Sequence, residues 1–296
     1  MADPRLLRLL RWFAKHKRRL PWRNTRDSYR IYISEIMLQQ TQVPRVLEHY
    51  RAWLRRFPSW KALAKARTDD ILRAWAGLGY NRRALHARDA ARHVLRHGVP
   101  KTLEEWMRLK GAGSYTARAA YAIVSRKPVL AIDTNVRRAA GRIFLGIPYP
   151  SPENDARIEK ALAKAGFGAP SHWALAQAFM DFGTAICRSK PNCGACPFAA
   201  DCMAAQEFLS GSAAKPKPRR AETVRAGKRY PDRIYRGRIV EILRTQQYAD
   251  LRTIGANIDP SYCHAHDAAW ITNMANRLVK DGLIGRRGFR IFLAME

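Results

Sequence analysis

Apolar residues recur at every third or fourth position along the first two thirds of the chain, and short polar turns separate these stretches. Pro, Gly, Asn and Asp mark the turns. No run alternates in the manner of a strand, so we expect an all-α domain of many short helices over residues 1–210. The periodicity predicts helices over residues 5–17, 29–40, 44–56, 69–76, 82–97, 115–125, 134–145 and 172–186.

The pattern changes after residue 210. Ten Lys and Arg stand against two Asp and Glu between Lys215 and Arg238, together with three prolines. This composition predicts a basic linker over residues 211–235. A solvated tether and a segment that follows DNA both fit it.

Residues 236–296 predict a second, smaller domain. Helices are expected near residues 238–244, 251–258 and 266–280, and two short strands near 283–284 and 290–293. Three helices followed by a basic hairpin favour a winged-helix-like domain. Winged helices commonly bind DNA, but the same topology also docks proteins, so both interpretations stay open.

Charge narrows the choice of partner. The chain carries 54 Lys and Arg against 24 Asp and Glu, a formal net charge of +30. Because this excess is spread over the whole chain, it favours a nucleic acid over a merely solvated basic surface or a membrane surface. No stretch approaches the roughly 20 apolar residues of a membrane span. Residues 1–20 alternate basic and apolar positions, unlike a secretory signal, so we expect a cytoplasmic protein, associated with the nucleoid if bacterial.

Four of the five cysteines lie within sixteen residues, at the spacing C-x5-C-x2-C-x5-C. Such clustering indicates metal ligation in a reducing compartment rather than a disulfide framework. Zinc sites often use two C-x2-C pairs, whereas only one is present, so the spacing favours a cubic iron–sulfur cluster over zinc or free thiols. The lone Cys263 is expected to be a small buried side chain. The candidate ligands are Cys187, Cys193, Cys196 and Cys202.

Gly111 and Gly113 stand one residue apart between two expected helices. Such a turn can bring backbone amides and a helix N-terminus against a phosphate, and Lys110 could add a charge. A simple helix–helix corner is the alternative. The strong basic charge favours the phosphate interpretation.

Two carboxylates are candidates for chemistry. Glu35 lies on the apolar stripe formed by Ile31 and Leu38, where burial would raise its pKa and make it a proton donor; a solvated glutamate is the alternative. Asp133 follows the apolar run 128–132 and precedes a helix. It can cap that helix and, with an oxygen facing a cleft, also stabilise an oxocarbenium-like sugar cation.

These motifs, in this order, resemble the helix–hairpin–helix DNA glycosylases that carry a [4Fe–4S] cluster, and among them the enzymes that excise mispaired adenine. The likeness covers residues 15–205. It is carried by the segments Leu20–Arg23, Ser34–Val43, Gly77–Tyr80, Leu109–Ala117, Asp133–Val136 and Ala176–Gly183, and by the cysteines.

The resemblance implies roles for residues at matching positions. Glu35 would protonate the departing base and Asp133 would stabilise the sugar cation, with Tyr115 and Asn135 lining the reacting centre. The remaining implied contacts are with DNA: Gln40 and Tyr80 as wedges beside the opposing base, Arg23 and Gln177 around the flipped base, and Lys110, Gly111 and Gly113 on backbone phosphate.

The implied reaction is hydrolysis of the N-glycosidic bond of a base flipped from duplex DNA, and the motifs favour adenine opposite G or 8-oxoguanine as the target. Relatives that also cut the strand have lysine where Tyr115 stands, so a monofunctional enzyme is expected. A glycosylase for thymine or uracil opposite G is the alternative within the family. A non-catalytic iron–sulfur regulator with a winged helix is the alternative of another class.

Three departures from the family pattern stand out. The first cysteine gap is five residues instead of the usual six, and Thr134 replaces a common glycine. A winged-helix-like segment also stands where the adenine enzymes usually carry a Nudix-like domain. We expect a monomer bound to mismatched duplex DNA. Its glycosylase domain would consist of a cluster subdomain (residues 1–23 and 129–210) and a helical subdomain (24–128).

Overall fold

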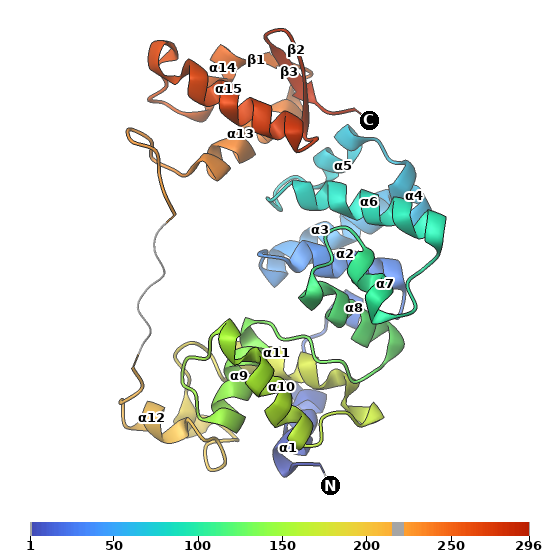
Figure 1. Ribbon diagram of the computed structural model, residues 1–296, viewed down its shortest axis with the longest axis vertical. Helices are drawn as coiled ribbons and strands as arrows, with labels where there is room; N and C mark the ends of the chain where they lie inside the picture. The colour runs from blue at the N-terminus through green and yellow to red at the C-terminus, as the bar shows by residue number, and fades with distance from the viewer. Residues whose placement is uncertain (1, 215–221, 296) are drawn as a thin grey trace. The chain divides into compact units, whose positions relative to one another are not determined.

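A computed structural model describes residues 2–214 and 222–295 (Figure 1). The chain forms two compact units, which are described separately. Unit 1 contains residues 1–35, 100–108 and 112–218, and unit 2 contains residues 36–99, 109–111 and 219–296. The boundaries of these units differ from the domain boundaries expected from the sequence, and the expected domains remain a prediction. Most of the expected linker core, residues 215–221, lies outside the described residues.

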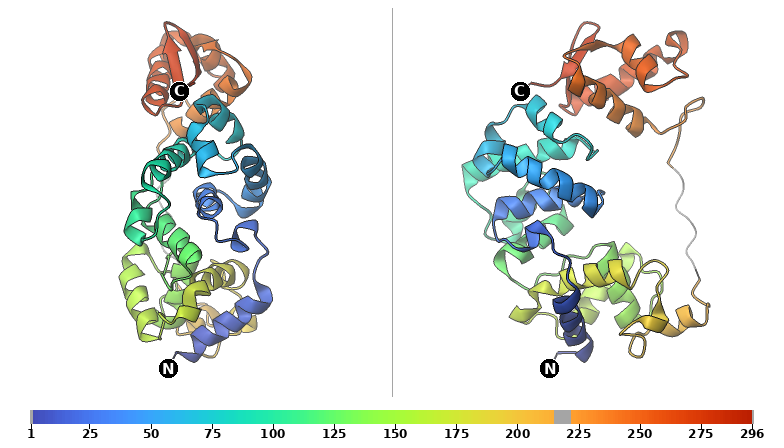
Figure 2. Two further views of the ribbon diagram at one scale, coloured as in Figure 1. Left: turned by 90° about the vertical axis from the view of Figure 1, so that its right-hand side faces the viewer. Right: turned by 180° about the vertical axis from the view of Figure 1, so that it is seen from behind.

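Unit 1 is helical. Helix α9 packs against α10 and α11, and α1 packs on α11; Figure 2 shows the N-terminal helix among the green and yellow helices of the same unit. Its helices are α1 (Pro4–His16), the first part of α2 (Ser28–Leu38), α7 (Leu103–Arg108), α8 (Ser114–Ser125), α9 (Thr134–Leu145), α10 (Asp155–Lys164), α11 (Leu175–Ala185) and α12 (Ala205–Leu209). Short 3-10 turns cover Pro21–Arg23, Pro152–Asn154, Pro170–Ala174 and Cys193–Ala195.

The core of unit 1 joins large and small apolar side chains. Phe179 and Phe182 of α11 pack with Ala139 and Ala140 of α9, whose small size lets the two helices approach closely. Gly183 marks the closest point, because a Cβ there would lie 2.8 Å from the Cβ of Asn135. The start of α9 is therefore fixed against α11, which matters for the residues that α9 carries.

Unit 2 begins with four helices, α3 (Val43–Arg56), α4 (Trp60–Lys65), α5 (Thr68–Ala74) and α6 (Arg82–His97). Its C-terminal part runs α13 (Asp232–Thr245), β1 (Ala249–Asp250), α14 (Leu251–Ile258), α15 (His264–Lys280), β2 (Ile284–Arg287) and β3 (Arg290–Leu293). The sheet has the order β1-β3-β2 and is antiparallel, with Ala249 opposite Ile291 and Ile284 opposite Leu293. This helix and strand order is that of a winged helix (red in Figure 1).

The C-terminal part shares a hydrophobic core with the helices before it. Leu72 of α5 and Leu85 of α6 are buried in the same cluster as Tyr235, Leu243 and Trp270. Buried Arg244 adds polar contacts, because its Nε donates to the Leu72 carbonyl at 3.0 Å and its Nη2 to Asn81 Oδ1 at 2.8 Å.

The structure corrects several sequence predictions. Cys263 is exposed rather than buried, because it caps the start of α15, which begins two residues earlier than expected. Helix α13 begins at Asp232, inside the expected linker, and Lys228 already bridges Asp259 and Asp267 at 2.7 and 2.6 Å. The short helices α4, α7, α10 and α12 were missed. Within the two described ranges, no helix is long and apolar enough to cross a membrane.

Candidate active site

Glu35 lies within residues 31–37 of α2, a stretch that is buried on every side. Its neighbours Ser34 and Ile36 have no exposed surface, and Glu35 itself is only 7% exposed. Burial, together with the negative charge of Asp133, raises the pKa of Glu35 to about 7, although Arg23 opposes the shift. The carboxyl group can therefore hold a proton near neutral pH, as the sequence predicts for a general acid.

Asp133 is the N-cap of α9. It is also close enough to Glu35 for its charge to raise the pKa of that residue, so one carboxylate both caps the helix and faces the site. Its Oδ1 accepts a hydrogen bond from the backbone N–H of Val136 at 2.7 Å, and its Oδ2 accepts one from the Asn135 side chain at 2.8 Å. The two contacts fix the orientation of the carboxylate. The lone pairs that remain on each oxygen can face a developing positive charge.

Asn135 links this carboxylate to the cysteine segment through Arg138. The Arg138 guanidinium donates to Asn135 Oδ1 at 2.7 Å, to the Gly183 carbonyl at 2.8 Å and to the Cys187 carbonyl at 2.7 Å. Helix α9 thus carries Asp133 at its first turn and a clamp on Cys187 one turn later. A movement of the cysteine segment would therefore displace the Asp133 carboxylate through these hydrogen bonds.

Arg23 is held by a carboxylate that sequence reasoning missed. Asp181 of α11 receives two hydrogen bonds from the Arg23 guanidinium, at 2.6 and 2.9 Å, and a further one from Arg18 Nε at 2.7 Å. Burial opposes ionisation of Asp181, but the hydrogen bonds and charges of the two arginines hold its pKa below the usual value. The signal was available, since Asp181 is a carboxylate in an apolar helix, as Glu35 is.

Tyr115 of α8 completes the group. Burial raises the pKa of its hydroxyl, and the charges of Glu35 and Asp133 raise it further, while Arg23 opposes the shift. The hydroxyl is therefore neutral at physiological pH and lies 4.0 Å from the Met180 sulfur. The structure thus brings Glu35, Asp133, Tyr115 and Arg23 into mutual electrostatic contact within unit 1. Gln177 is buried one turn before Asp181 on α11.

Gln40 and Tyr80 in unit 2 share an unusual backbone. Both adopt positive φ, +57° and +46°, which non-glycine residues rarely do, and Tyr80 is 50% exposed. The structure presents both as exposed side chains on constrained turns. Their roles as wedges stay a prediction.

The two turns are held by one buried side chain, Arg83, which sequence reasoning also missed. Its guanidinium donates to the carbonyls of Gln39 and Gly79, the residues directly before the two exposed side chains, the second at 3.1 Å. It also donates to the Leu78 carbonyl at 2.9 Å and to Thr41 Oγ1 at 3.1 Å. A single guanidinium therefore fixes both turns.

The glycine turn has the geometry of a hairpin between helices. Gly111 adopts φ +82°, which favours glycine, and its carbonyl accepts a hydrogen bond from Gln39 Nε2 at 3.0 Å. Gly113 is the N-cap of α8 and has no side chain of its own to cap that helix end. The exposed Gly113 and Ser114 thus present the N-terminus of a twelve-residue helix, beside the exposed Lys110.

The four clustered cysteines line one hollow in unit 1, together with Arg142, Phe182 and Phe198. Buried Arg142 donates to the Cys187 sulfur at 3.5 Å, to the Arg188 carbonyl at 2.6 Å and to the Ser189 carbonyl at 3.2 Å. Over residues 2–214 and 222–295, no three His, Cys, Asp or Glu side chains are arranged to hold one metal ion.

Comparisons with known proteins agree with this fold. Residues 33–165 match the model of the HhH-GPD superfamily base excision DNA repair proteins. An adenine DNA glycosylase of Mycobacterium tuberculosis (strain H37Rv) is 35% identical over 94% of this chain and 89% of its own length. That of Mycolicibacterium smegmatis is 32% identical over 93% and 91%. These alignments span most of the C-terminal segment too.

Among solved structures, a thermostable thymine-DNA glycosylase superposes with a TM-score of 0.61 at 27% identity. The match covers 68% of this chain and 95% of that one. The helix–hairpin–helix fold class expected from the sequence is thereby confirmed.

Proposed function

The chain belongs to the adenine DNA glycosylase family within the HhH-GPD superfamily, and from this we propose that it excises adenine opposite G or 8-oxoguanine in duplex DNA. The observation that carries the proposal is the pairing of a buried Glu35, with a pKa of about 7, and the oriented carboxylate of Asp133. Excision of a base needs a proton donor and a stabiliser of the sugar cation, and these two residues suit the two tasks.

The reaction begins with extrusion of the target nucleotide, which costs a few kcal/mol. The basic surface and the Lys110–Gly113 turn offset this cost through phosphate contacts. Glu35 then gives its proton to the base as the C1′–N9 bond breaks, and the bonding electron pair leaves on the base. Asp133 faces the resulting sugar cation. Water adds to C1′ and loses a proton, which leaves an abasic site and free adenine.

Tyr115 makes the enzyme monofunctional in this proposal. A lyase step needs an amine that condenses with C1′ of the sugar, and a neutral phenol cannot form a Schiff base. The raised pKa of the Tyr115 hydroxyl keeps it protonated, so it can only donate or accept a hydrogen bond at the reacting centre. The strand therefore stays intact until alkali is added.

The cysteine hollow fits a [4Fe–4S] cluster held by Cys187, Cys193, Cys196 and Cys202. Buried Arg142 beside the Cys187 sulfur supports this assignment, because four thiolates and their irons would bring net negative charge next to it. When bound, the cluster would supply rigidity to its loop. Through the Arg138 contacts, that rigidity would reach Asn135 and Asp133.

Base release from four matched duplexes tests the target base: A opposite 8-oxoguanine, A opposite G, T opposite G, and U opposite G. We expect release from the first two, with strand breaks only after alkali. The likeness to a thymine-DNA glycosylase makes excision of T or U opposite G the second candidate. Preferential release of T or U would replace the adenine assignment, and borohydride trapping with breaks before alkali would overturn the monofunctional one.

Base release should weaken as the pH rises, because the protonated form of Glu35 is the active one. With a pKa of about 7, the single-turnover rate should reach a plateau at acidic pH and fall roughly tenfold per unit above neutrality. Saturating enzyme keeps changes in DNA affinity out of the rate. A rate that instead climbs through neutral pH to an alkaline plateau would show that a deprotonated group limits the reaction.

A further inference from the structure

The C-terminal winged helix presents a polar, acid-free stripe along α15. Five of its exposed residues recur at spacings of three and four, which places these five on one face of the helix. The acid of this helix, Asp267, is turned inward and bound by Lys228 at 2.6 Å. The stripe consists of His266, Ala269, Asn273, Asn276 and Lys280.

The hairpin between β2 and β3 continues this face. Phe289 at its tip is 82% exposed, more than any other large apolar side chain in the described ranges. Arg286, Arg287 and Arg290 around it are all exposed, and Arg286 donates to Asn276 Oδ1 of α15 at 3.3 Å. An exposed aromatic ring surrounded by arginines is suited to a partner with both negative charge and flat or grooved apolar surface.

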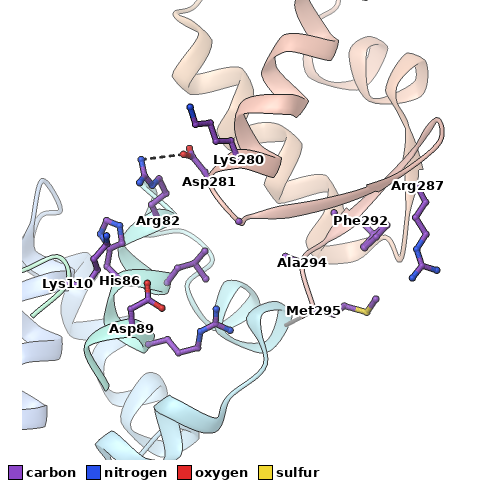
Figure 3. Close-up of a pocket in the computed structure, with 14 residues that line it drawn as sticks. Arg82, His86, Asp89, Lys110, Lys280, Asp281, Arg287, Phe292, Ala294 and Met295 are labelled. Atoms are coloured by element: carbon purple, nitrogen blue, oxygen red, sulfur yellow. Dashed lines mark ion pairs between the residues drawn. The ribbon is translucent and has the colours of Figure 1, made fainter. Parts of the chain in front are cut away.

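The stripe ends in a basic hollow of about 640 Å³ that also reaches the glycine turn. Lys280 and Arg287 line this hollow with Arg82, His86 and Lys110 (Figure 3). Two acids, Asp89 and Asp281, also line the hollow, but Lys and Arg outnumber them, and Asp281 pairs with Arg82 at 3.3 Å. Lys110 belongs to the turn proposed above to bind phosphate. The basic surface is therefore continuous from that turn to the hairpin.

We propose that the α15 stripe and the β2–β3 hairpin bind the same DNA duplex as the Lys110–Gly113 turn, outside the position of the flipped base. The inference rests on the proposed function. A duplex fits better than a protein, because Lys280 and Arg287 supply point charges for phosphates and Asn273 and Asn276 supply donors and acceptors for base edges. The hairpin tip places Phe289 where a groove would receive it.

The α15 stripe and the hairpin would lengthen the contact with DNA. They would take no part in the chemical step. Each phosphate that a Lys or Arg neutralises releases counterions, so the logarithm of the binding constant falls with the logarithm of the salt concentration by about 0.9 per contact. The C-terminal charges should therefore appear as a steeper salt dependence. They should leave the rate of base release at saturating enzyme unchanged.

The test is a double variant, Lys280→Gln with Arg287→Gln, bound to an undamaged duplex of about three helical turns at several salt concentrations. Both side chains are exposed, so the fold should survive. The salt slope is expected to fall by roughly 2. A control with Lys61→Gln and Arg252→Gln removes the same charge from exposed positions elsewhere in unit 2 and should change the slope far less.

Phe289→Ala adds a measurement that does not depend on charge, with Leu95→Ala, also exposed, as its control. The hydroxyl-radical footprint on the duplex should be shorter for Phe289→Ala than for the wild type, and unchanged for Leu95→Ala. Equal salt slopes for the two double variants, with an unchanged footprint for Phe289→Ala, would overturn the proposal and favour a protein partner. Because undamaged DNA is used, this outcome is independent of whether adenine is excised.

Discussion

Glu35→Gln is expected to reduce single-turnover base release by about 10²- to 10⁴-fold, the usual contribution of a positioned general acid. The amide has nearly the same shape as the carboxyl group, so the buried helix should keep its packing, but it has no acidic proton to transfer to the base. Affinity for a duplex with the mismatch should persist, since Glu35 is 7% exposed and the basic surface carries the phosphate contacts. Rapid-quench assays and titration of labelled duplex measure the two quantities separately.

The same substitution should also stabilise the protein above neutral pH. Because burial raises the pKa of Glu35 from 4.5 to about 7, the folded state loses stability as the pH rises through that interval. At higher pH this loss amounts to about 3 kcal/mol, which glutamine avoids. Denaturant unfolding should therefore show the variant more stable than the wild type at about pH 8, and little different at about pH 4.

Glu48→Gln is the matched control, because Glu48 is an exposed carboxylate on α3. It should leave base release, duplex affinity and stability near the wild-type values. If Glu35→Gln released base as fast as Glu48→Gln, Glu35 would not be the acid. A wild-type protein that binds mismatched duplex but releases no base at all would favour the non-catalytic regulator.

The helical period predicted the long helices well, because residues that pack on one side of a helix recur at a fixed interval. Helix α6 and helix α9 have the expected bounds. Helices such as α4 and α7 have only six residues, too few to show a period, and were missed. The two hairpin strands were found, although β2 extends to Arg287 because Arg286 and Arg287 pair with β3, whereas the two-residue strand β1 was missed.

The site was predictable only where a residue's own chemistry marks it. Glu35 and Asp133 stood out as carboxylates in apolar surroundings, and the structure brings them together. The residues that hold the site in place could not be predicted in the same way. Arg83 is one arginine among many, and its role depends on carbonyls of two turns that are about 40 residues apart along the chain. Arg138 likewise acts through backbone groups that no side-chain pattern reveals.

Cys202→Ser is expected to cost the protein its cofactor and much of its stability. The segment from Cys187 to Cys202 has little regular structure of its own beyond a three-residue turn, and only a few protein contacts hold it, chiefly from Arg138 and Arg142. A metal site that forms only in the folded state adds its binding free energy to folding, typically many kcal/mol. The variant should lose the brown absorbance at about 400 nm that a [4Fe–4S] cluster gives, unfold at lower temperature, and bind duplex DNA at least tenfold more weakly.

Cys263→Ser provides the control for the chemistry of the substitution. Cys263 is exposed and lies at the start of α15, far along the chain from the cysteine hollow, so its replacement should leave absorbance, melting temperature and DNA affinity unchanged. Iron and acid-labile sulfide, at about four each per chain, identify the cubic cluster. One zinc per chain and a colourless protein would replace it with a single ion. An unaltered melting temperature for Cys202→Ser would mean that the cysteine loop is stable without a cofactor. The hydrogen bonds that connect Cys187 through Arg138 and Asn135 to Asp133 would then also form without one.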